Sequence, residues 1–346
     1  MTEPNHLSIG KKFLFSICSI VFAIILAVTI LEIGVRIYES YFLVPQKNSK
    51  NLYSYDEKLG WRLNDGTFRQ LHRDFNTVYS VTRGQRNSRS GNGKNVINFY
   101  GDSFCFGTGV ADDETVASFV AANLENVSVA NHGVAGYGPL QYTLKYQSTK
   151  SSFLNIFMIY TGNDYQDLQN DRIAWGPFKP HLTRSVNDKD TYNISFPPNH
   201  FRLILEKDDK ADFELRAPNF VKNILKSIPF VVQLRGAFIS PNKSFVQESL
   251  KRLDYLLGQI DSHDSVIVIV PSLSLVSNIS TNSDEGYFQR ELVNFLDRRS
   301  IKYIDLLSTA DLDPSDFFPN EGHNNEAGNA KIAQAIEAYL RKNFIY

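Results

Sequence analysis

From Lys94 onward, short β-rich runs alternate with longer helical patterns. The run at 265–270 is apolar at every position after Ser265, which suits a strand that is buried on both faces of a sheet. Strands that alternate with helices predict an α/β fold, a three-layer α/β/α domain whose central parallel sheet is covered on both faces. We expect strands at 96–100, 126–130, 155–160, 265–270 and 303–306, and helices at 114–124, 140–149, 244–260, 286–298 and 327–342.

The stretch 165–243 interrupts this alternation. It is rich in Asn, Asp, Lys and Pro and contains the aromatic residues Trp175, Phe178, Phe196 and Phe201. Loops of this length inside a compact domain are usually functional or disordered. We therefore expect an insertion, with some helix around 219–235, that overhangs the carboxyl edge of the sheet and shapes a substrate site. A decoration without function is the alternative.

An apolar run from Phe13 to Leu31 follows Lys11 and Lys12 near the amino terminus. Its length approaches what a helix needs to cross a bilayer core of about 30 Å. The run is longer than the apolar part of a signal peptide and has no small-residue cleavage site after it. The sequence therefore predicts one uncleaved transmembrane anchor over 13–38, with a cleavable signal peptide or a buried core helix as the alternatives.

The charges around this run bear on its orientation. Lys11 and Lys12 favour a cytoplasmic location for residues 1–12, although Arg36, Lys47 and Lys50 on the other side weaken the bias. Because the amino-side flank is so short, we expect a single-pass membrane protein with the bulk of the chain outside the cytoplasm.

Residues 39–93 are polar and turn-rich, with alternating pieces such as 77–81 that are typical of strands. They are interpreted as a linker and a small β-rich lead-in packed on the main domain, which covers 94–346. The basic cluster Arg83 to Arg89 is expected to be a solvated loop. The net charge of −1 and the lack of a basic block argue against nucleic-acid binding. The two cysteines form no metal-ligand spacing, and no disulfide between them is expected.

A glycine turn carries a serine directly after the first expected strand. Gly101, Asp102 and Ser103 follow the β-rich run 95–100. Glycine, aspartate and serine are also ordinary turn and helix-capping residues, so the tripeptide alone fits a structural turn equally well. Open α/β sheets, however, place their active sites at the carboxyl ends of strands. The Ser103 hydroxyl is therefore a candidate nucleophile.

Other candidate site residues are also expected at this edge of the sheet. Gly136 and Asn163 also follow expected strands, and His323 lies in a late loop before the last helix. A serine hydroxyl becomes a good nucleophile when a histidine accepts its proton. The oxyanion that develops needs donors already in place, and the Ser103 and Gly136 N–H groups with the Asn163 amide can supply them. These residue types fit acyl transfer.

Short blocks of this chain resemble those of the SGNH (GDSL) hydrolase superfamily. The blocks are Gly101-Asp102-Ser103-Phe104, Asn131-x-Gly133-x-x-Gly136, Gly162-Asn163-Asp164 and Glu321-Gly322-His323-Asn324-Asn325. Each is weak alone, but their order and their places at strand ends make the set specific, over roughly 95–165 and 300–342. The resemblance implies a nucleophile at Ser103, a base at His323, oxyanion donors at Ser103, Gly136 and Asn163, and no metal or organic cofactor.

The last block departs from the usual family pattern. The family commonly places an aspartate three residues before the histidine, and here that position is Asn320. A related branch, with polysaccharide O-acetyltransferase-like members, has its acid two residues before, and Glu321 fits that register with one extra methylene. The resemblance thus implies a catalytic Glu321 that orients His323. A weaker Ser–His dyad is the alternative, with Asp316 as a distant substitute for the acid.

The expected function is that of a membrane-anchored SGNH-type serine esterase, with its domain on the periplasmic side of a bacterial inner membrane. An acyl group on a cell-surface carbohydrate suits the anchor and the aromatic insertion. Lipid or small-ester hydrolysis and acetyl transfer are alternatives, as is a non-catalytic scaffold for envelope polysaccharide assembly. No Gly-x-Ser-x-Gly or Gly-x-Gly-x-x-Gly motif supports an α/β-hydrolase or a nucleotide binder.

Overall fold

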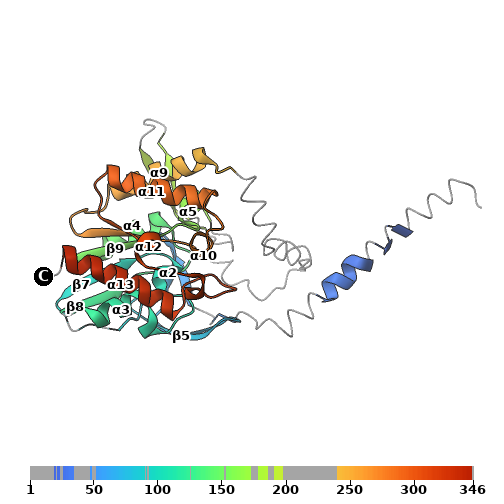
Figure 1. Cartoon of the computed structure of the whole chain (residues 1–346), viewed down its shortest axis with the longest axis horizontal. Helices are drawn as coiled ribbons and strands as arrows, with labels where there is room; N and C mark the ends of the chain where they lie inside the picture. The colour runs from blue at the N-terminus through green and yellow to red at the C-terminus, as the bar shows by residue number, and fades with distance from the viewer. Residues whose placement is uncertain are drawn as a thin grey trace, which may run out of the picture. The chain divides into compact units, whose positions relative to one another are not determined.

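The computed structural model describes residues 52–172, 178–185, 191–197 and 240–344, with single-residue gaps at 90, 92, 125 and 152, together with 47–48 and parts of a helix between 19 and 34 (Figure 1). The chain divides into two compact units, which are treated separately below. The smaller unit comprises Met1–Pro45 and Ala211–Val232, and the larger comprises Gln46–Lys210 and Gln233–Tyr346.

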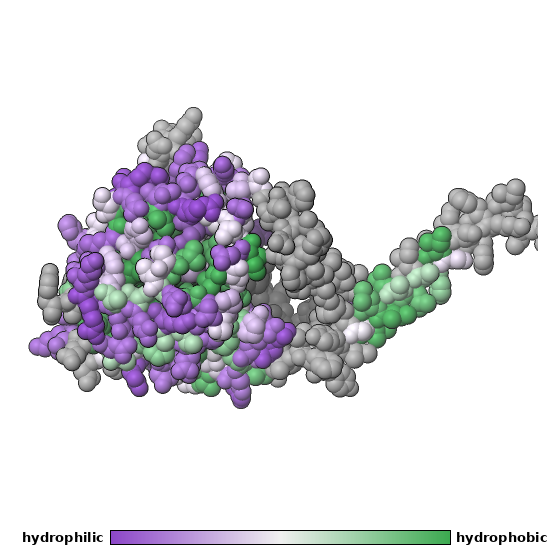
Figure 2. Space-filling view, in the orientation of Figure 1, coloured by the Kyte–Doolittle hydropathy of each residue, from purple (hydrophilic) through white to green (hydrophobic). Residues whose placement is uncertain are grey.

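The described part of the smaller unit is the helix that includes residues 26–34. Its apolar side chains are largely exposed, with Ile20, Phe22 and Ile30 between 60% and 66% accessible (Figure 2). No helix among the described residues is both long enough and apolar enough to span a membrane. Residues 13–18 and 35–38 of the predicted anchor lie outside the described residues, so the anchor over 13–38 stays a prediction.

The larger unit is built on a nine-stranded sheet with the order β1-β4-β5-β6-β8-β7-β9-β12-β13. Strands β8, β7, β9, β12 and β13 run parallel to one another. These strands confirm the expected ranges to within one residue. Their bounds are β7 (Asn95–Tyr100), β8 (Val127–Asn131), β9 (Leu154–Tyr160), β12 (Ser265–Val270) and β13 (Tyr303–Asp305).

Strands of the lead-in extend this same sheet on its β8 side. They are β1 (Lys47–Asn48), β4 (Gly66–Leu71), β5 (Asn76–Thr82) and β6 (Gln85–Arg86), which pair antiparallel in the order β1-β4-β5-β6. Strand β6 joins β8 through the pair Arg86 and Asn131. A separate antiparallel hairpin consists of β2 (Tyr53–Asp56) and β3 (Gly60–Leu63). Much of the expected lead-in is therefore part of the central sheet rather than an element packed on it.

Helices cover both faces of the sheet, as the alternating pattern predicts (Figure 1). Helices α4, α9 and α11 pack on one face, and α3 and α13 pack on the other. Helix α11 shows the local signals that set such limits, because the Ser283 hydroxyl caps its first turn and Asp284 and Glu285 lie at its positive end. The bounds are α3 (Val116–Asn123), α4 (Pro139–Thr149), α9 (Lys243–Leu257), α11 (Asp284–Arg298) and α13 (Glu326–Asn343).

Shorter helices begin where the parallel strands end. Helix α2 (Ser103–Phe106) follows β7, α5 (Asp164–Asp167) follows β9, α10 (Leu273–Val276) follows β12, and α12 (Leu306–Thr309) follows β13. Two 3₁₀ turns, η1 (Asp112–Glu114) and η3 (Pro314–Asp316), lie in loops. The strand ends therefore lead directly into the short segments that can carry functional residues.

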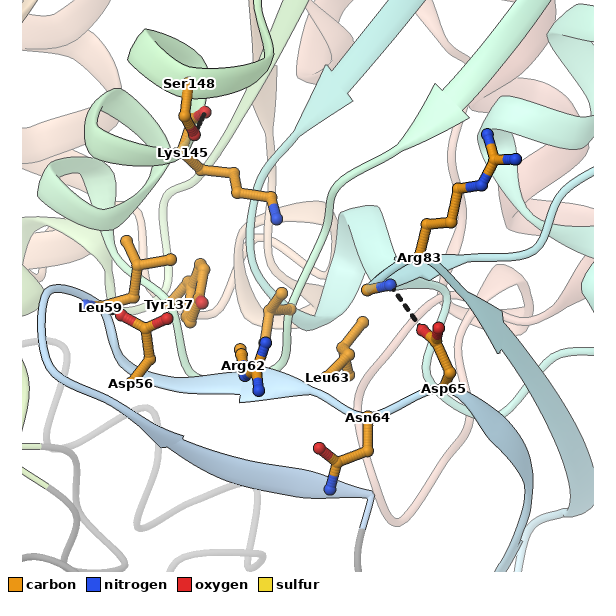
Figure 3. A pocket seen from close by; sticks show the side chains of 12 residues that line it. Asp56, Leu59, Arg62, Leu63, Asn64, Asp65, Arg83, Tyr137, Lys145 and Ser148 are labelled. Carbon is orange, nitrogen blue, oxygen red and sulfur yellow. Dashed lines mark hydrogen bonds between the residues drawn. The ribbon is translucent and has the colours of Figure 1, made fainter.

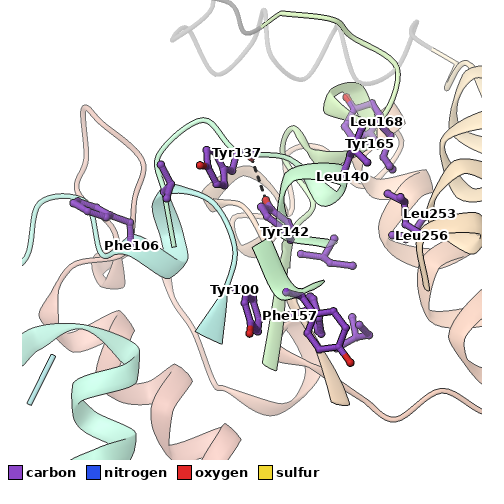
Figure 4. Close-up of a cluster of buried hydrophobic side chains, with 14 of the residues drawn as sticks. Tyr100, Phe106, Tyr137, Leu140, Tyr142, Phe157, Tyr165, Leu168, Leu253 and Leu256 are labelled. Carbon is purple, nitrogen blue, oxygen red and sulfur yellow. Dashed lines mark hydrogen bonds between the residues drawn. The ribbon is translucent and has the colours of Figure 1, made fainter. Parts of the chain in front are cut away.

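The apolar core consists of two clusters, one on each face of the sheet. Along β12, Ile267 and Ile269 belong to the cluster under α4, α9 and α11, whereas Val266 and Val268 belong to the cluster under α3 and α13. This alternation follows from the two-residue period of a strand. Figure 4 shows the first cluster, where Tyr100 and Phe157 stack with ring centroids 5.1 Å apart. Two buried faces explain why the strand at 265–270 has no polar side.

The insertion at 165–243 is described only in part. It contains α5 and an antiparallel hairpin of β10 (His181–Arg184) and β11 (Tyr192–Ser195). The hairpin is held to helix α9, because Arg252 donates hydrogen bonds to the carbonyl oxygens of Leu168 at 3.2 Å and Leu182 at 2.7 Å. The expected helix at 219–235, together with Trp175 and Phe201, lies outside the described residues.

The expectation of a solvated basic loop is wrong for one member of the cluster. Arg86 is only 1% exposed. Its guanidinium donates to the carbonyl oxygens of Phe106 at 3.3 Å and Val110 at 2.9 Å, and it forms an ion pair with Asp112. Strand β6 brings Arg86 under the segment that follows Ser103, where these carbonyl groups need donors. Arg86 is therefore a structural cation inside the domain.

Candidate active site

Ser103 follows a tight turn in which position 101 has no room for a side chain. The Asp102 carboxylate caps α2 by accepting a hydrogen bond from the Phe104 N–H at 2.9 Å. A Cβ atom at Gly101 would lie 2.6 Å from the Cβ of Cys105 and 3.1 Å from the Met158 carbonyl oxygen. Position 101 therefore requires glycine, and the turn presents Ser103 as the first residue of α2 at the carboxyl end of β7.

The structure brings Ser103, His323 and Glu321 together. The Ser103 Oγ lies 2.5 Å from Nε2 of His323. The other ring nitrogen, Nδ1, contacts the Glu321 carboxylate, which also accepts a hydrogen bond from the His323 backbone N–H at 3.2 Å. The side chains of His323 and Glu321 are 17% and 15% exposed. A hydroxyl, an imidazole and a carboxylate thus form one continuous chain of contacts that solvent still reaches.

Asn320 has a different partner. Its side-chain amide donates to one Asp74 carboxylate oxygen at 2.6 Å, and its backbone N–H donates to the other at 2.9 Å. Asp74 belongs to the turn between β4 and β5, and the next residue, Phe75, packs on Phe318 with ring centroids 5.0 Å apart. The lead-in therefore holds the loop that carries His323. The sequence gives no sign of this contact, because the two segments are 246 residues apart.

Gly136 and Asn163 lie in loops on either side of Ser103. The sheet order β8-β7-β9 makes their strands the two neighbours of the strand that ends before Ser103. Gly136 has φ +80°, a left-handed conformation that favours glycine. Asn163 precedes α5 and is half-buried, and its buried side-chain oxygen has no hydrogen-bond partner among the described residues. The roles of these residues as oxyanion donors remain predictions.

The loop around Gly136 is fastened to the β2–β3 hairpin. The Trp61 indole N–H donates to the Ala135 carbonyl oxygen at 3.1 Å, and the Tyr137 hydroxyl donates to the Trp61 carbonyl oxygen at 2.6 Å. The two rings meet edge to face with centroids 5.5 Å apart. Trp61 is 1% exposed, so these contacts are shielded from water. A hairpin outside the recognised blocks thus fixes the backbone on both sides of Gly136.

Buried carboxyl groups gather beside the candidate nucleophile, which the sequence does not reveal. Asp102 and Asp164 are 1% and 0% exposed. Asp164 accepts a hydrogen bond from the Tyr142 hydroxyl at 2.9 Å. Asp167 forms an ion pair with Lys179, whose side chain is 1% exposed. The described cluster therefore pairs one buried cation with several buried acids, an arrangement that opposes ionisation of all the acids together.

Burial raises the pKa of Asp102 to about 7. The Phe104 N–H and His323 favour the ionised form of Asp102, and Asp167 opposes it. Burial also raises the pKa of Asp164 well above its ordinary value, and the charges of Asp102 and Asp167 raise it further. These buried acids therefore hold protons at pH values where exposed carboxyl groups have lost theirs.

His132 and Cys105, which lie in or near these blocks, are both buried. His132 is 2% exposed and stacks on Tyr100 with ring centroids 5.1 Å apart, and burial lowers its pKa to about 3. Cys105 is buried, and burial raises the pKa of its thiol. No group of three or more His, Cys, Asp or Glu side chains in the described part of the chain is arranged to hold a metal ion.

Comparison with known proteins finds similarity at the level of structure. No protein-family model matches the chain, and no curated protein sequence matches it. Among solved structures, it is similar to a member of the lipolytic protein G-D-S-L family from Veillonella parvula, at 16% identity and a TM-score of 0.39. That match covers 71% of this chain and 98% of the other.

Further matches have similar coverage. The lipase/acylhydrolase from Enterococcus faecalis is 13% identical with a TM-score of 0.40, over 72% of this chain and 96% of that one. A carbohydrate acetylesterase from Sinorhizobium meliloti is 10% identical with a TM-score of 0.39, over 72% and 100%.

The contact between Asn320 and Asp74 predicts the effect of an aspartate at position 320. Asn320→Asp places a second carboxylate against Asp74 and removes a charge-assisted hydrogen bond, so we expect a loss of about 1–3 kcal/mol in the free energy of unfolding. The double variant Asp74→Asn with Asn320→Asp exchanges donor and acceptor and should recover most of that loss. Urea unfolding of the single and double variants measures both effects. An Asn320→Asp variant as stable as the wild type would contradict a stabilising role for this contact.

The raised pKa of Asp102 predicts a pH dependence of stability. Between about pH 4 and pH 7, Asp102 ionises in the unfolded chain but stays protonated in the folded one, so its contribution to stability is lost as the pH rises through this window. Asp102→Asn keeps the capping oxygen and removes the titration. We therefore expect the free energy of unfolding of the variant, minus that of the wild type, to increase as the pH rises across the window. The expected increase is about 1 kcal/mol for each unit by which folding raises the pKa of Asp102.

Urea unfolding of both proteins across this pH range measures the difference. Stability profiles that stay parallel from about pH 4 to pH 8 would show that the Asp102 carboxyl does not retain its proton in the folded protein.

Proposed function

We propose that this protein is a serine esterase in which Ser103 is the nucleophile, His323 the general base and Glu321 the acid that orients the imidazole. The observation that carries the proposal is the 2.5 Å contact between the Ser103 Oγ and His323 Nε2, with the Glu321 carboxylate on Nδ1 of the same ring. A carboxylate there favours the tautomer whose Nε2 can accept a proton, and it stabilises the imidazolium that forms. The extra methylene of glutamate does not prevent this contact.

The reaction proceeds through an acyl-enzyme. The Ser103 oxygen forms a bond to the ester carbonyl carbon while His323 takes the serine proton, which gives a tetrahedral oxyanion. The C–O bond to the leaving alcohol then breaks, and the imidazolium returns the proton to the alcohol oxygen. Water attacks the acyl-serine by the same route, with His323 again as base, and releases the acid and free Ser103. A sugar hydroxyl in place of water makes the same step an acyl transfer.

The oxyanion is assigned to the N–H groups of Ser103 and Gly136 and the side-chain amide of Asn163. The position of these residues at the ends of three adjacent strands, in the order β8-β7-β9, supports this assignment. The hydrogen bond from Trp61 to Ala135 supports it further, because a fixed backbone keeps its donors oriented before the reaction begins.

For the substrate, we favour an acyl ester on a cell-surface carbohydrate. The insertion's aromatic residues support this choice, since aromatic side chains offer flat apolar faces for sugar rings, and Phe196 is 49% exposed. Lipid or small-ester hydrolysis and acetyl transfer are the alternative activities. Acetate release from an acetylated polysaccharide, compared with that from p-nitrophenyl acetate, separates them, and turnover of the small ester alone would remove the carbohydrate from the proposal.

We also propose that residues 13–38 anchor the protein in a bacterial inner membrane, with the larger unit on the periplasmic side. The apolar run from Phe13 to Leu31 and the exposed apolar side chains between Ile20 and Ile33 support this. The full chain is expected in the alkali-washed membrane fraction, and a chain that lacks 1–45 in the soluble fraction. Recovery of the full chain in the soluble fraction would contradict the proposal.

Labelling by a fluorophosphonate tests the catalytic assignment, because only an activated serine reacts with it. We expect the wild type to be labelled and Ser103→Ala to remain unlabelled. Glu321→Gln keeps a hydrogen-bonding side chain but loses the charge that stabilises the imidazolium, so its labelling should be slower by at least about tenfold. Mass spectrometry of the labelled protein measures the rates.

Glu326→Gln is the matched control for this series. Glu326 is exposed at the start of α13, and the same substitution there should leave labelling unchanged. An unlabelled wild type, under conditions in which a known serine esterase reacts, would overturn the proposal and favour a non-catalytic scaffold.

A further inference from the structure

A cavity of about 510 Å³ lies between the β2–β3 hairpin, the turn between β5 and β6, and helix α4 (Figure 3). Ser103, His323 and Glu321 do not line it. One wall contains Val134 and Tyr137, which flank Gly136 in the loop after β8. The cavity is therefore separate from the candidate catalytic residues but borders the loop that carries one of the proposed oxyanion donors.

The charged side chains around the cavity are mostly cationic. Arg62, Arg83 and Lys145 line it together with the carboxylates of Asp56 and Asp65. Cations thus outnumber acids in the lining, and Arg62 and Arg83 are exposed to solvent. An excess of positive charge at a concave surface raises the local concentration of anions.

Both carboxylates are used by backbone turns. Asp56 accepts hydrogen bonds from the N–H groups of Lys58 and Leu59, each at 2.9 Å. Asp65 accepts one from the Gly84 N–H at 2.7 Å. These acids hold the two turns that form the rim of the cavity, and neither forms an ion pair with a cation of the lining within the described residues.

Lys145 is the least exposed of the three cations that line the cavity. It extends from α4 with its ammonium group directed into the cavity, on the side of Arg62 (Figure 3). The ammonium has no hydrogen-bond or ion-pair partner in the described part of the chain. Burial lowers the pKa of Lys145, the charge of Asp56 raises it, and the charge of Arg62 lowers it by a smaller amount. A half-buried ammonium that has no such partner among the described residues is a site that a bound anion stabilises.

We propose that this cavity is a binding site for the carboxylate or phosphate group of a small polar molecule, with Lys145 and Arg62 as its cationic partners. The guanidinium of Arg62 can donate two parallel hydrogen bonds to either group, and the ammonium of Lys145 adds a mobile point charge. The volume of about 510 Å³ leaves room for a ligand of the size of a sugar acid or a sugar phosphate. The site does not depend on the proposed esterase activity.

Isothermal titration of the purified full chain tests the proposal. The probes are sodium glucuronate and sodium phosphate in a buffer free of other oxyanions, with glucose as the neutral counterpart of glucuronate. We expect saturable binding of at least one anion and none of glucose. Lys145→Gln should weaken that binding by about tenfold or more, because a charged hydrogen bond is lost. Arg62→Gln, at an exposed position that tolerates the change, should weaken it as well.

Lys251→Gln is the matched control, since Lys251 is exposed on α9 and does not line the cavity. It should bind the anion as the wild type does. Tighter binding of glucuronate assigns the site to a carboxylated sugar, and tighter binding of phosphate assigns it to a phosphate ester. No saturable binding of either anion up to about 50 mM would overturn the proposal, as would equal weakening in Lys251→Gln.

Ser103→Ala, titrated in parallel, should bind the anion normally. Normal binding by this variant would show that the anion site does not require the proposed nucleophile, because the substitution leaves the cavity intact. A wild type that resists fluorophosphonate but binds the anion would remove the esterase and keep the site.

Discussion

The contact between Ser103 and His323 joins residues 220 positions apart in the sequence. The rest of the fold has to keep these two side chains in position. The serine is fixed by a turn in which Gly101 has no space for a side chain. The histidine lies on a loop, which needs support from outside. Glu321 supplies part of it through the imidazole and the backbone, and Asp74 supplies another part through Asn320. The hydrogen bond between Ser103 and His323 therefore depends on the contacts that position these two side chains.

The amino-terminal strands thus have a direct relation to the site. Trp61 fastens the loop of Gly136, Asp74 fastens the loop of His323, and Arg86 binds the backbone carbonyl groups just after Ser103. These contacts come from the lead-in, which precedes every recognised block. Because preorganised donors stabilise a transition state without a cost of reordering, such rigid support fits the proposed chemistry. The same hairpin that holds Gly136 also forms one wall of the cationic cavity.

The sequence predicts the parallel strands and the major helices well because their signals are local. A continuous apolar run, as at 265–270, or a cap such as Ser283 is visible without knowledge of the fold. The blocks around Ser103 and His323 are visible too, and the strand-end rule places them at one edge. The pairing of Arg86 with Asn131 and the burial of Asp164 depend on contacts between residues that are distant in sequence. A local sequence pattern therefore does not predict them. The resemblance points to Glu321 rather than Asn320, but nothing in the sequence indicates that Asn320 binds Asp74.

Detection of an acyl group on Ser103 tests the central claim most directly. The protein is mixed with p-nitrophenyl acetate, quenched with acid within the first turnover, digested and examined by mass spectrometry. We predict acetylation of the peptide that contains Ser103, and its loss on longer incubation as water attacks the acyl-serine. Turnover without an acetylated Ser103, or acetylation confined to another residue, would contradict the assignment of Ser103 as the nucleophile.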